Sequence, residues 1–152
     1  MATTPWLDPD EQRAWRTYLR MQARLHRQLA QQLQRDAGMS AADFEVLVNL
    51  SEADGGRLRA FELGDALQWE KSRLSHHLTR MESRDLVVRE ECTTDARGAF
   101  VRITDQGRAA IEHAAPMHVA EVRARFVDAL STAQLRALEE ICETVLATLE
   151  EG

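Results

Sequence analysis

The sequence lacks the features that would place the protein in a membrane or outside the cell. It contains no apolar run of about 18 residues, so we expect no membrane-spanning helix and no membrane partner. Its first residues show neither the charged start nor the apolar core of a secretory signal, so we expect a cytoplasmic protein. Only two cysteines, Cys92 and Cys142, occur in 152 residues, which favours reduced thiols over a disulfide framework.

The sequence also lacks the residue patterns on which catalysis and cofactor binding depend. No Ser/His/Asp or paired-carboxylate constellation, no glycine-rich phosphate loop and no Cys/His cluster with zinc spacing is present. We therefore predict no enzyme, no cofactor and no metal site. The composition, with 44% hydrophobic and 29% charged residues, indicates a globular protein rather than a disordered one.

Positive charge is scarce overall but locally concentrated. The net charge is −6, which disfavours indiscriminate binding to nucleic acid but permits a local basic surface. From Glu11 to Asp36 there are six arginines and two acidic residues, whereas eight acidic residues and four arginines follow from Arg108 to the end. Between Lys71 and Met81 there are three cations and no acidic residue.

That acid-free stretch belongs to a segment, Gln68 to Arg84, around which the chain is organised. Leu74, Leu78 and Met81 recur at spacings of four and three, which predicts one buried face of a helix. A solvated helix surface would explain the polar face, but exposed helices normally mix both charge signs. Arginine can read guanine edges, and serine can reach bases or phosphates. We therefore predict DNA contacts from this helix, by Lys71, Ser72, Arg73, Ser75, His76 and Arg80.

Three further side chains of this segment need an interpretation. His77 and Thr79 are placed on the same polar face. Because His76 and His77 are adjacent and point to different sides of the helix, a shared metal site is not expected. Trp69, just before the helix, is expected to pack on the turn rather than on the DNA backbone.

The segments before this helix are mainly helical. Residues 1–8 are expected to form a short arm, because Pro5 and the following Pro9 block regular structure. A long helix is predicted from about Glu11 to Arg35. Gly38 is a plausible helix stop, and a new helix begins at Ser40, its N-cap, with Asp43 in the first turn. A very short strand at 57–59 and a short helix at 61–67 complete this half.

After residue 84 the periodicity changes to that of strands. Runs at 86–90 and 100–103 are joined by a polar loop with one glycine, which predicts a hairpin. A long helix follows from Thr104 to about Leu130, and Pro116 should kink or break it. A capping box at Ser131 opens a terminal helix whose apolar seam includes Cys142, which we expect to be core.

Helix, short strand, helix, helix and hairpin is the order of a winged helix-turn-helix. The predicted fold is therefore mainly α with a small β-hairpin wing. We expect an N-terminal arm and dimerisation helix at 1–39, a winged helix-turn-helix DNA-binding domain at 40–104, and C-terminal dimerisation helices at 105–152.

Five stretches in this order form one pattern. They are Phe-Glu-Val-Leu-Val-Asn-Leu at 44–50, Glu-Leu-Gly-Asp-Ala-Leu at 62–67, the helix at 71–82, Asp-Ala-Arg at 95–97, and Val-Arg-Ile-Thr-Asp-Gln-Gly at 101–107. Together they resemble the MarR family of bacterial transcriptional regulators. The resemblance covers nearly the whole chain, and its most specific part is the Asp-x-Arg in the wing followed by a strand ending in Thr-x-x-Gly. Asp85 departs from the glycine that the family usually has before the leucine at 86, but aspartate tolerates the left-handed conformation better than most residues.

The resemblance implies a homodimer that binds double-stranded DNA at a palindromic operator, with the terminal helices of both chains forming the interface. It implies that Arg97 enters the minor groove and that Asp95 helps to hold it, although an internal Asp95–Arg97 ion pair fits as well. It also implies a repressor that a small aromatic or anionic effector releases. The effector would bind a crevice between the dimer layer and the winged module, for which core packing is the alternative. The candidate lining residues are Trp15, Tyr18, Met21, Phe44, His113 and His118.

Two other functions compete with this prediction. An oxidant-sensing regulator would act through Cys92 at the base of the wing, although nothing in the surrounding sequence guarantees a reactive thiol. A winged-helix protein-interaction module would not bind DNA at all.

Overall fold

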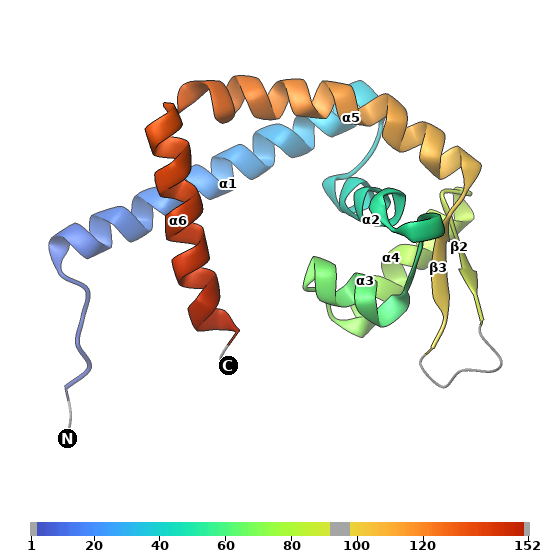
Figure 1. The fold of residues 1–152 in the computed structure, drawn as a ribbon, viewed down its shortest axis with the longest axis horizontal. Coiled ribbons are helices and arrows are strands. Elements are labelled where there is room, and N and C mark those ends of the chain that lie inside the picture. Colours follow the sequence, from blue (N-terminus) through green and yellow to red (C-terminus); the bar gives the residue numbers. More distant parts are fainter. Residues whose placement is uncertain (1–2, 92–97, 151–152) are drawn as a thin grey trace.

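The computed structural model describes residues 3–91 and 98–150, and these form a mainly helical chain with one small sheet (Figure 1). Single turns of 3₁₀ helix at Asp54–Gly56 and Val127–Ala129 connect some elements. None of the described helices is both long enough and apolar enough to cross a membrane. The helices are α1 (Pro9–Ala37), α2 (Ala41–Glu52), α3 (Ala60–Leu67), α4 (Lys71–Ser83), α5 (Asp105–Arg125) and α6 (Thr132–Leu149), and the strands are β1 (Arg57–Arg59), β2 (Val87–Glu90) and β3 (Phe100–Ile103).

One apolar core holds α2, α3 and α4 against the sheet. Side chains that are almost fully buried come from all three helices and from β2 and β3, so the helices cannot shift independently without opening voids. The core extends to α5 through Ile111 and Ala114. Its most buried members are Val46, Leu47, Leu50, Leu63, Leu78, Met81, Val87 and Val101.

The sheet has the strand order β1-β3-β2, and both pairings are antiparallel. Arg57 lies opposite Arg102 on one side of β3, and Val87 lies opposite Ile103 on the other. The predicted very short strand and the predicted hairpin are therefore both confirmed, and together they give the winged helix-turn-helix fold.

Proline positions correct two sequence predictions. Pro9 does not block regular structure but occupies the first turn of α1, where its missing N–H costs nothing, and Asp8 caps the helix. Pro116 does not break α5, which is continuous from Asp105 to Arg125 while it packs against α1 and α2. Tertiary packing therefore outweighs the local penalty of a helix-interior proline.

The long helices extend away from the winged unit. Figure 1 shows α1 and α5 running together above α2, with the N-terminal half of α1 and the whole of α6 projecting to one side. No residue of α6 is buried within the chain. The expectation that Cys142 belongs to a core is therefore wrong for the single chain, in which this thiol is exposed. The division of the chain into dimerisation helices and a DNA-binding domain, with boundaries after residues 39 and 104, stays a prediction.

Candidate nucleic-acid interface

Helix α4 has one buried face and one exposed face, as its periodicity predicts. Leu74, Leu78 and Met81 are buried in the core. All six side chains predicted to contact DNA lie on the exposed part of the helix, and no acidic residue lies among them. They are Lys71, Ser72, Arg73, Ser75, His76 and Arg80.

The turn between α3 and α4 is tightly built. Gln68 ends α3 in the left-handed conformation, with φ of 56°, and its side-chain amide donates to the backbone oxygen of Asp65 at 2.6 Å. The Trp69 ring packs edge-on against the His77 ring, with the ring centroids 5.4 Å apart, which supports the expected packing role of Trp69. The guanidinium of Arg73 lies over the Trp69 ring at 4.2 Å, a cation–π contact that orients Arg73 beside the exposed face.

Arg89 of β2 ties the wing to α4. Its guanidinium donates to the hydroxyls of Thr79 at 2.7 Å and Ser75 at 3.4 Å, and to the carboxylate of Glu82 at 3.2 Å. The backbone N–H of Arg89 also donates to Glu82, and these bonds hold the pKa of the Glu82 carboxyl below its usual value although burial opposes them. Ser75, a predicted DNA contact, therefore also accepts a hydrogen bond from Arg89 within the protein.

A buried ionic cluster joins α2 to α4, and its members were not among the predicted site residues. The carboxylate of Asp43 accepts two hydrogen bonds from Arg84, at 2.7 and 3.0 Å, and lies 2.9 Å from Nε2 of His77. His77 is only 8% exposed, so its placement on the polar face of the helix is wrong. Arg80 in turn lies 3.1 Å from Nδ1 of His77.

The junction of the wing with α5 explains the Thr-x-x-Gly sequence. The Thr104 hydroxyl donates to the backbone oxygen of Asp85 and accepts from the N–H of Gly107, and so caps α5. A side chain at position 107 would meet the backbone oxygen of Leu86 at 2.1 Å, so only glycine fits. Asp85 adopts the left-handed conformation, with φ of 59°, as expected for this departure from glycine.

Three of the sequence predictions for the wing concern residues outside the described ranges. They are the DNA contacts Asp95 and Arg97 and the oxidation candidate Cys92. The strands beside the tip are well anchored, because Arg102 pairs with Glu90 at 2.6 Å and Arg57 lies over the Phe100 ring at 4.4 Å.

A hollow of about 610 Å³ lies beside the exposed face of α4. It is formed by α3, the first turns of α4, Arg89 of β2 and the two residues before β3. Two predicted DNA contacts, Lys71 and Ser75, line it. Phe61, Trp69 and Leu74 add apolar surface. The basic face of α4 is thus bordered by a concave, partly apolar surface rather than by a flat one.

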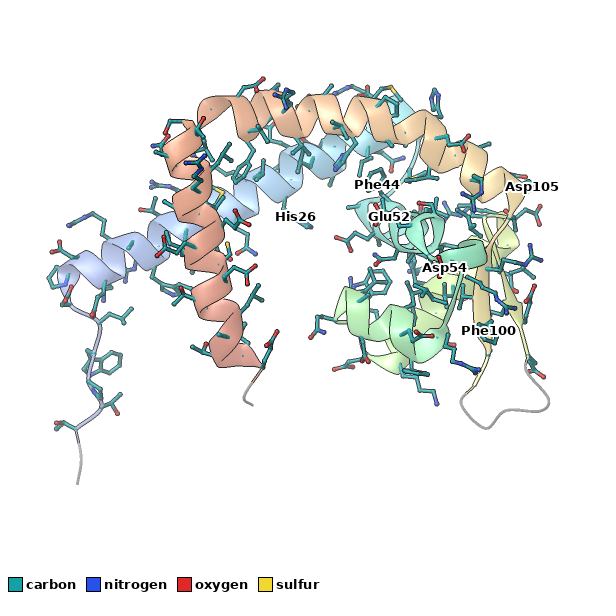
Figure 2. All side chains as sticks on the ribbon, viewed as in Figure 1. His26, Phe44, Glu52, Asp54, Phe100 and Asp105 are labelled. Atoms are coloured by element: carbon teal, nitrogen blue, oxygen red, sulfur yellow. The ribbon has the colours of Figure 1, made fainter. Side chains whose placement is uncertain are left out.

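The six candidate effector residues do not meet in one cavity of the described structure. Phe44 and His118 are in contact, with ring centroids 4.4 Å apart, and Nδ1 of His118 lies 3.0 Å from the side-chain oxygen of Gln32 (Figure 2 labels Phe44 on α2). Burial lowers the pKa of His118, so its ring is held neutral. His113 is exposed elsewhere on α5.

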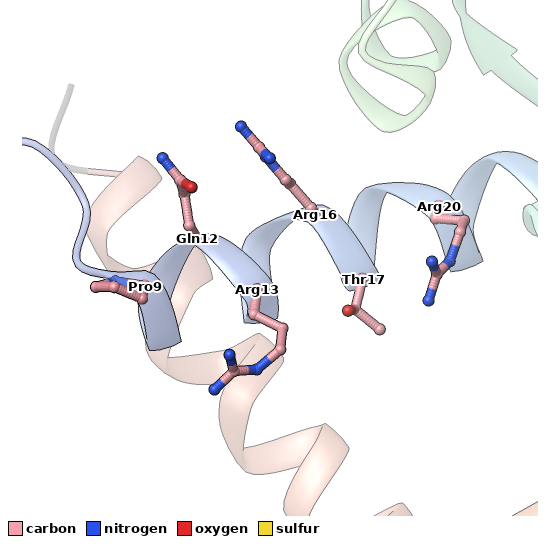
Figure 3. A pocket seen from close by; sticks show the side chains of 6 residues that line it. All are labelled: Pro9, Gln12, Arg13, Arg16, Thr17 and Arg20. Carbon is pink, nitrogen blue, oxygen red and sulfur yellow. The ribbon is translucent and has the colours of Figure 1, made fainter.

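The other three candidates lie on the projecting half of α1. The rings of Trp15 and Tyr18 are in contact, with centroids 5.8 Å apart, and both side chains remain about half exposed. Met21 lines a separate hollow beside Phe126. A further shallow hollow on α1 is lined by arginines instead (Figure 3). Over the described ranges, no group of three potential metal-ligating side chains occurs.

Two crystal structures resemble this chain over nearly its whole length. The MarR family transcriptional regulator AbsC from Streptomyces coelicolor is 42% identical, with a TM-score of 0.93, over 98% of this chain and 100% of that chain. A second MarR family regulator from the same organism, Sco3205, solved in complex with DNA, is 40% identical, with a TM-score of 0.91, over 95% of this chain and 91% of that chain.

Sequence comparisons agree with the structural ones. The MarR family model matches residues 37–98, which include α2, α3, α4 and β2. An HTH-type transcriptional regulator of Bacillus cereus is 27% identical over 118 residues, 78% of this chain and 77% of that protein. These relatives are transcriptional regulators and not enzymes. The chain belongs to the MarR family of transcriptional regulators.

Proposed function

We propose that this chain forms a homodimer that binds a palindromic DNA operator, represses transcription there, and is released by a small effector. The observation that carries the proposal is the exposed face of α4, which bears cations and hydroxyls but no acid and is mounted rigidly on a buried core. That combination suits a helix that lies in the major groove. The relative Sco3205 was solved in complex with DNA.

Contacts can be divided by position along α4. Lys71 and Ser72 lie in the first turn, where the helix dipole and free N–H groups favour phosphate. Arg73 and Arg80 are proposed to reach base edges, with Ser75 and His76 between them. Arg97, assisted by Asp95, is proposed to enter the neighbouring minor groove, and this assignment rests on the sequence alone.

Dimerisation is supported by apolar side chains that α1 and α6 leave exposed. Trp15, Tyr18 and Leu19 on α1, and Ile141, Val145 and Leu149 on α6, are 42–68% exposed in the single chain. Two reading helices must lie about 34 Å apart to enter successive major grooves. A dimer built through the terminal helices would set that separation.

Effector control would act through the junction of α1, α2 and α5. Phe44 and His118 meet there, beside the buried Gln32, so a ligand that separates them would tilt the winged unit relative to the long helices. A small aromatic or anionic molecule is the proposed ligand class. Such control is a coupling free energy between two sites.

The experiment is a mobility shift with the DNA upstream of the protein's own gene. We expect Arg97→Ala and Arg73→Ala each to weaken binding about tenfold, equivalent to the ~1–3 kcal/mol of a good base contact. Arg136→Ala is the matched control, because it removes one exposed arginine from α6. Wild-type affinity should fall steeply with salt. Equal binding by all four proteins, or by none, would contradict the proposal.

A further inference from the structure

The side chains behind Arg80 form a chain of contacts that runs from the core to the exposed face of α4. Asp43 of α2, with a side chain only 3% exposed, lies 2.9 Å from Nε2 of His77. Nδ1 of His77 lies 3.1 Å from a terminal nitrogen of the Arg80 guanidinium. Arg80 itself is exposed and is one of the six proposed DNA contacts.

The chemistry of the two outer groups determines where the proton on His77 lies. A guanidinium can only donate, so Nδ1 must be the acceptor in its contact with Arg80. A carboxylate can only accept, so Nε2 must carry the hydrogen. The contacts are thus satisfied together by one neutral tautomer of His77. The other neutral tautomer breaks both contacts, and the doubly protonated ring breaks the contact with Arg80.

The surroundings of His77 favour that neutral state. Burial has the largest effect and lowers its pKa below the usual value of 6.5, Asp43 opposes this, and the cations Arg80 and Arg84 add to it. From the turn before α4, Trp69 closes the site with the edge of its ring, at 5.4 Å. The charged groups that face His77 are therefore Asp43 from α2, Arg80 from α4 and Arg84 from the C-cap of α4.

We propose that His77 is a positioning residue that fixes Arg80 for DNA recognition, with Asp43 setting the tautomer. The inference rests on the proposed DNA binding by α4. Protonation of His77 would place a hydrogen on Nδ1, remove the acceptor and set a second cation against the guanidinium. Arg80 would then lose its fixed direction, so discrimination between DNA sequences would fall in acid.

Two substitutions separate the contacts of His77. His77→Asn keeps an acceptor near the position of Nδ1 but cannot reach Asp43, whereas His77→Gln reaches toward Asp43 but presents nothing to Arg80. The probe is a duplex that the wild-type protein selects from a random pool, compared with a scrambled duplex of equal length. Thermal unfolding of each variant shows that it is folded, and His26→Asn on α1 is the matched control.

We expect His77→Gln to lower the ratio of specific to scrambled affinity about tenfold and His77→Asn to lower it less. In the background of Arg80→Ala, His77→Gln should have no further effect, because the residue it positions is gone. The wild-type ratio should fall as the pH is lowered from neutral at constant ionic strength, whereas the ratio for Arg80→Ala should stay flat.

Nitrogen NMR of the DNA-free protein tests the tautomer independently of DNA. An unprotonated Nδ1 is expected, and a protonated Nδ1 at pH 7.5 would overturn the inference. Folded His77→Gln that discriminates like wild type, or additive effects with Arg80→Ala, would overturn it too. A pool that yields no selected duplex would instead refute the proposed function, and with it any role of His77 in DNA recognition.

Discussion

Asp43 acts in two ways at the first turn of α2. It completes a capping box with Ser40, and its carboxylate is the buried acceptor for Arg84 and His77. Burial alone would raise the pKa of Asp43, but its bonds to Arg84 and Ser40 outweigh this and hold the pKa below the usual 3.8. A buried carboxylate of this kind is costly to leave without its partners, so α2 and α4 are joined by charge as well as by apolar packing.

Stability should therefore depend on pH in two separate windows. Both Asp43 and His77 have lowered pKa values in the folded protein, so the unfolded chain binds more protons and stability falls as the pH falls. The contribution of His77 is lost below about pH 6.5, and that of Asp43 below about pH 4. Chemical unfolding across the pH range measures both.

Variants measure the share of each residue in its window. Asp43→Asn should lower the free energy of unfolding at pH 7 by about 1.5–3 kcal/mol, the value of hydrogen bonds to a charged group, and should weaken the acid window, to which Glu82 also contributes. His77→Asn should weaken the window below pH 6.5, to which His118 also contributes. An Asp43→Asn protein with wild-type stability and an unchanged acid limb would show that the buried cluster does not stabilise the fold.

At the scale of elements, a close backbone approach lies where α5 begins beside the turn between α4 and β2. Gly107 has no room for a side chain, since a β-carbon would lie 2.1 Å from the backbone oxygen of Leu86. The side-chain amide of Gln106 also donates to the backbone oxygen of Arg84, which ends α4. This junction fixes the start of α5 against the winged unit.

Gly107→Ala should destabilise the protein by about 1–3 kcal/mol, the cost of overpacking a well-packed site, because backbone rather than a flexible side chain is in the way. Gly64→Ala in α3 is the control, since its new methyl would lie 3.5 Å from the nearest atom. That change should be neutral or should stabilise α3 by up to about 1 kcal/mol. Urea unfolding measures both, and equal effects would contradict the close approach.

The order of the elements could be predicted because it depends on local patterns. Periodicity alone placed α4, and turn residues placed the hairpin. His77 shows where this fails: it lies three residues after Leu74 and four before Met81, on the buried face, but its polar character suggested exposure. Its partner Asp43 is 34 residues away in the sequence, and a local sequence pattern cannot predict a contact between residues so far apart. The spread of the six candidate effector residues over separate places has the same cause.

At the scale of the whole molecule, charge and apolar surface are separated. From Arg108 to the end, eight acidic residues outnumber four arginines, while α4 is free of acid from Lys71 to Met81. The projecting α1 and α6 carry most of the large apolar side chains that the single chain leaves exposed. Exposed apolar surface of this extent on two long helices marks an interface rather than a solvated surface.

The proposed dimer makes a specific demand on α6. Val145 is 53% exposed in the single chain, within the apolar seam that also contains Leu149. In a two-fold interface Val145→Glu would bury one new charge from each copy, so the penalty counts twice. We expect sedimentation velocity at micromolar concentration to show a monomer.

Ala147→Glu is the matched control, because position 147 lies about 200° around the helix from position 145 and is exposed. It adds the same charge to the same helix and should leave the dimer intact. Binding to a two-half-site duplex should fall by about 10²-fold or more for Val145→Glu, since avidity is lost, but binding to a single half-site should change little. If Val145→Glu stays dimeric, the seam of α6 is not the interface. If it becomes monomeric yet binds the full operator as wild type does, the two copies do not read DNA together.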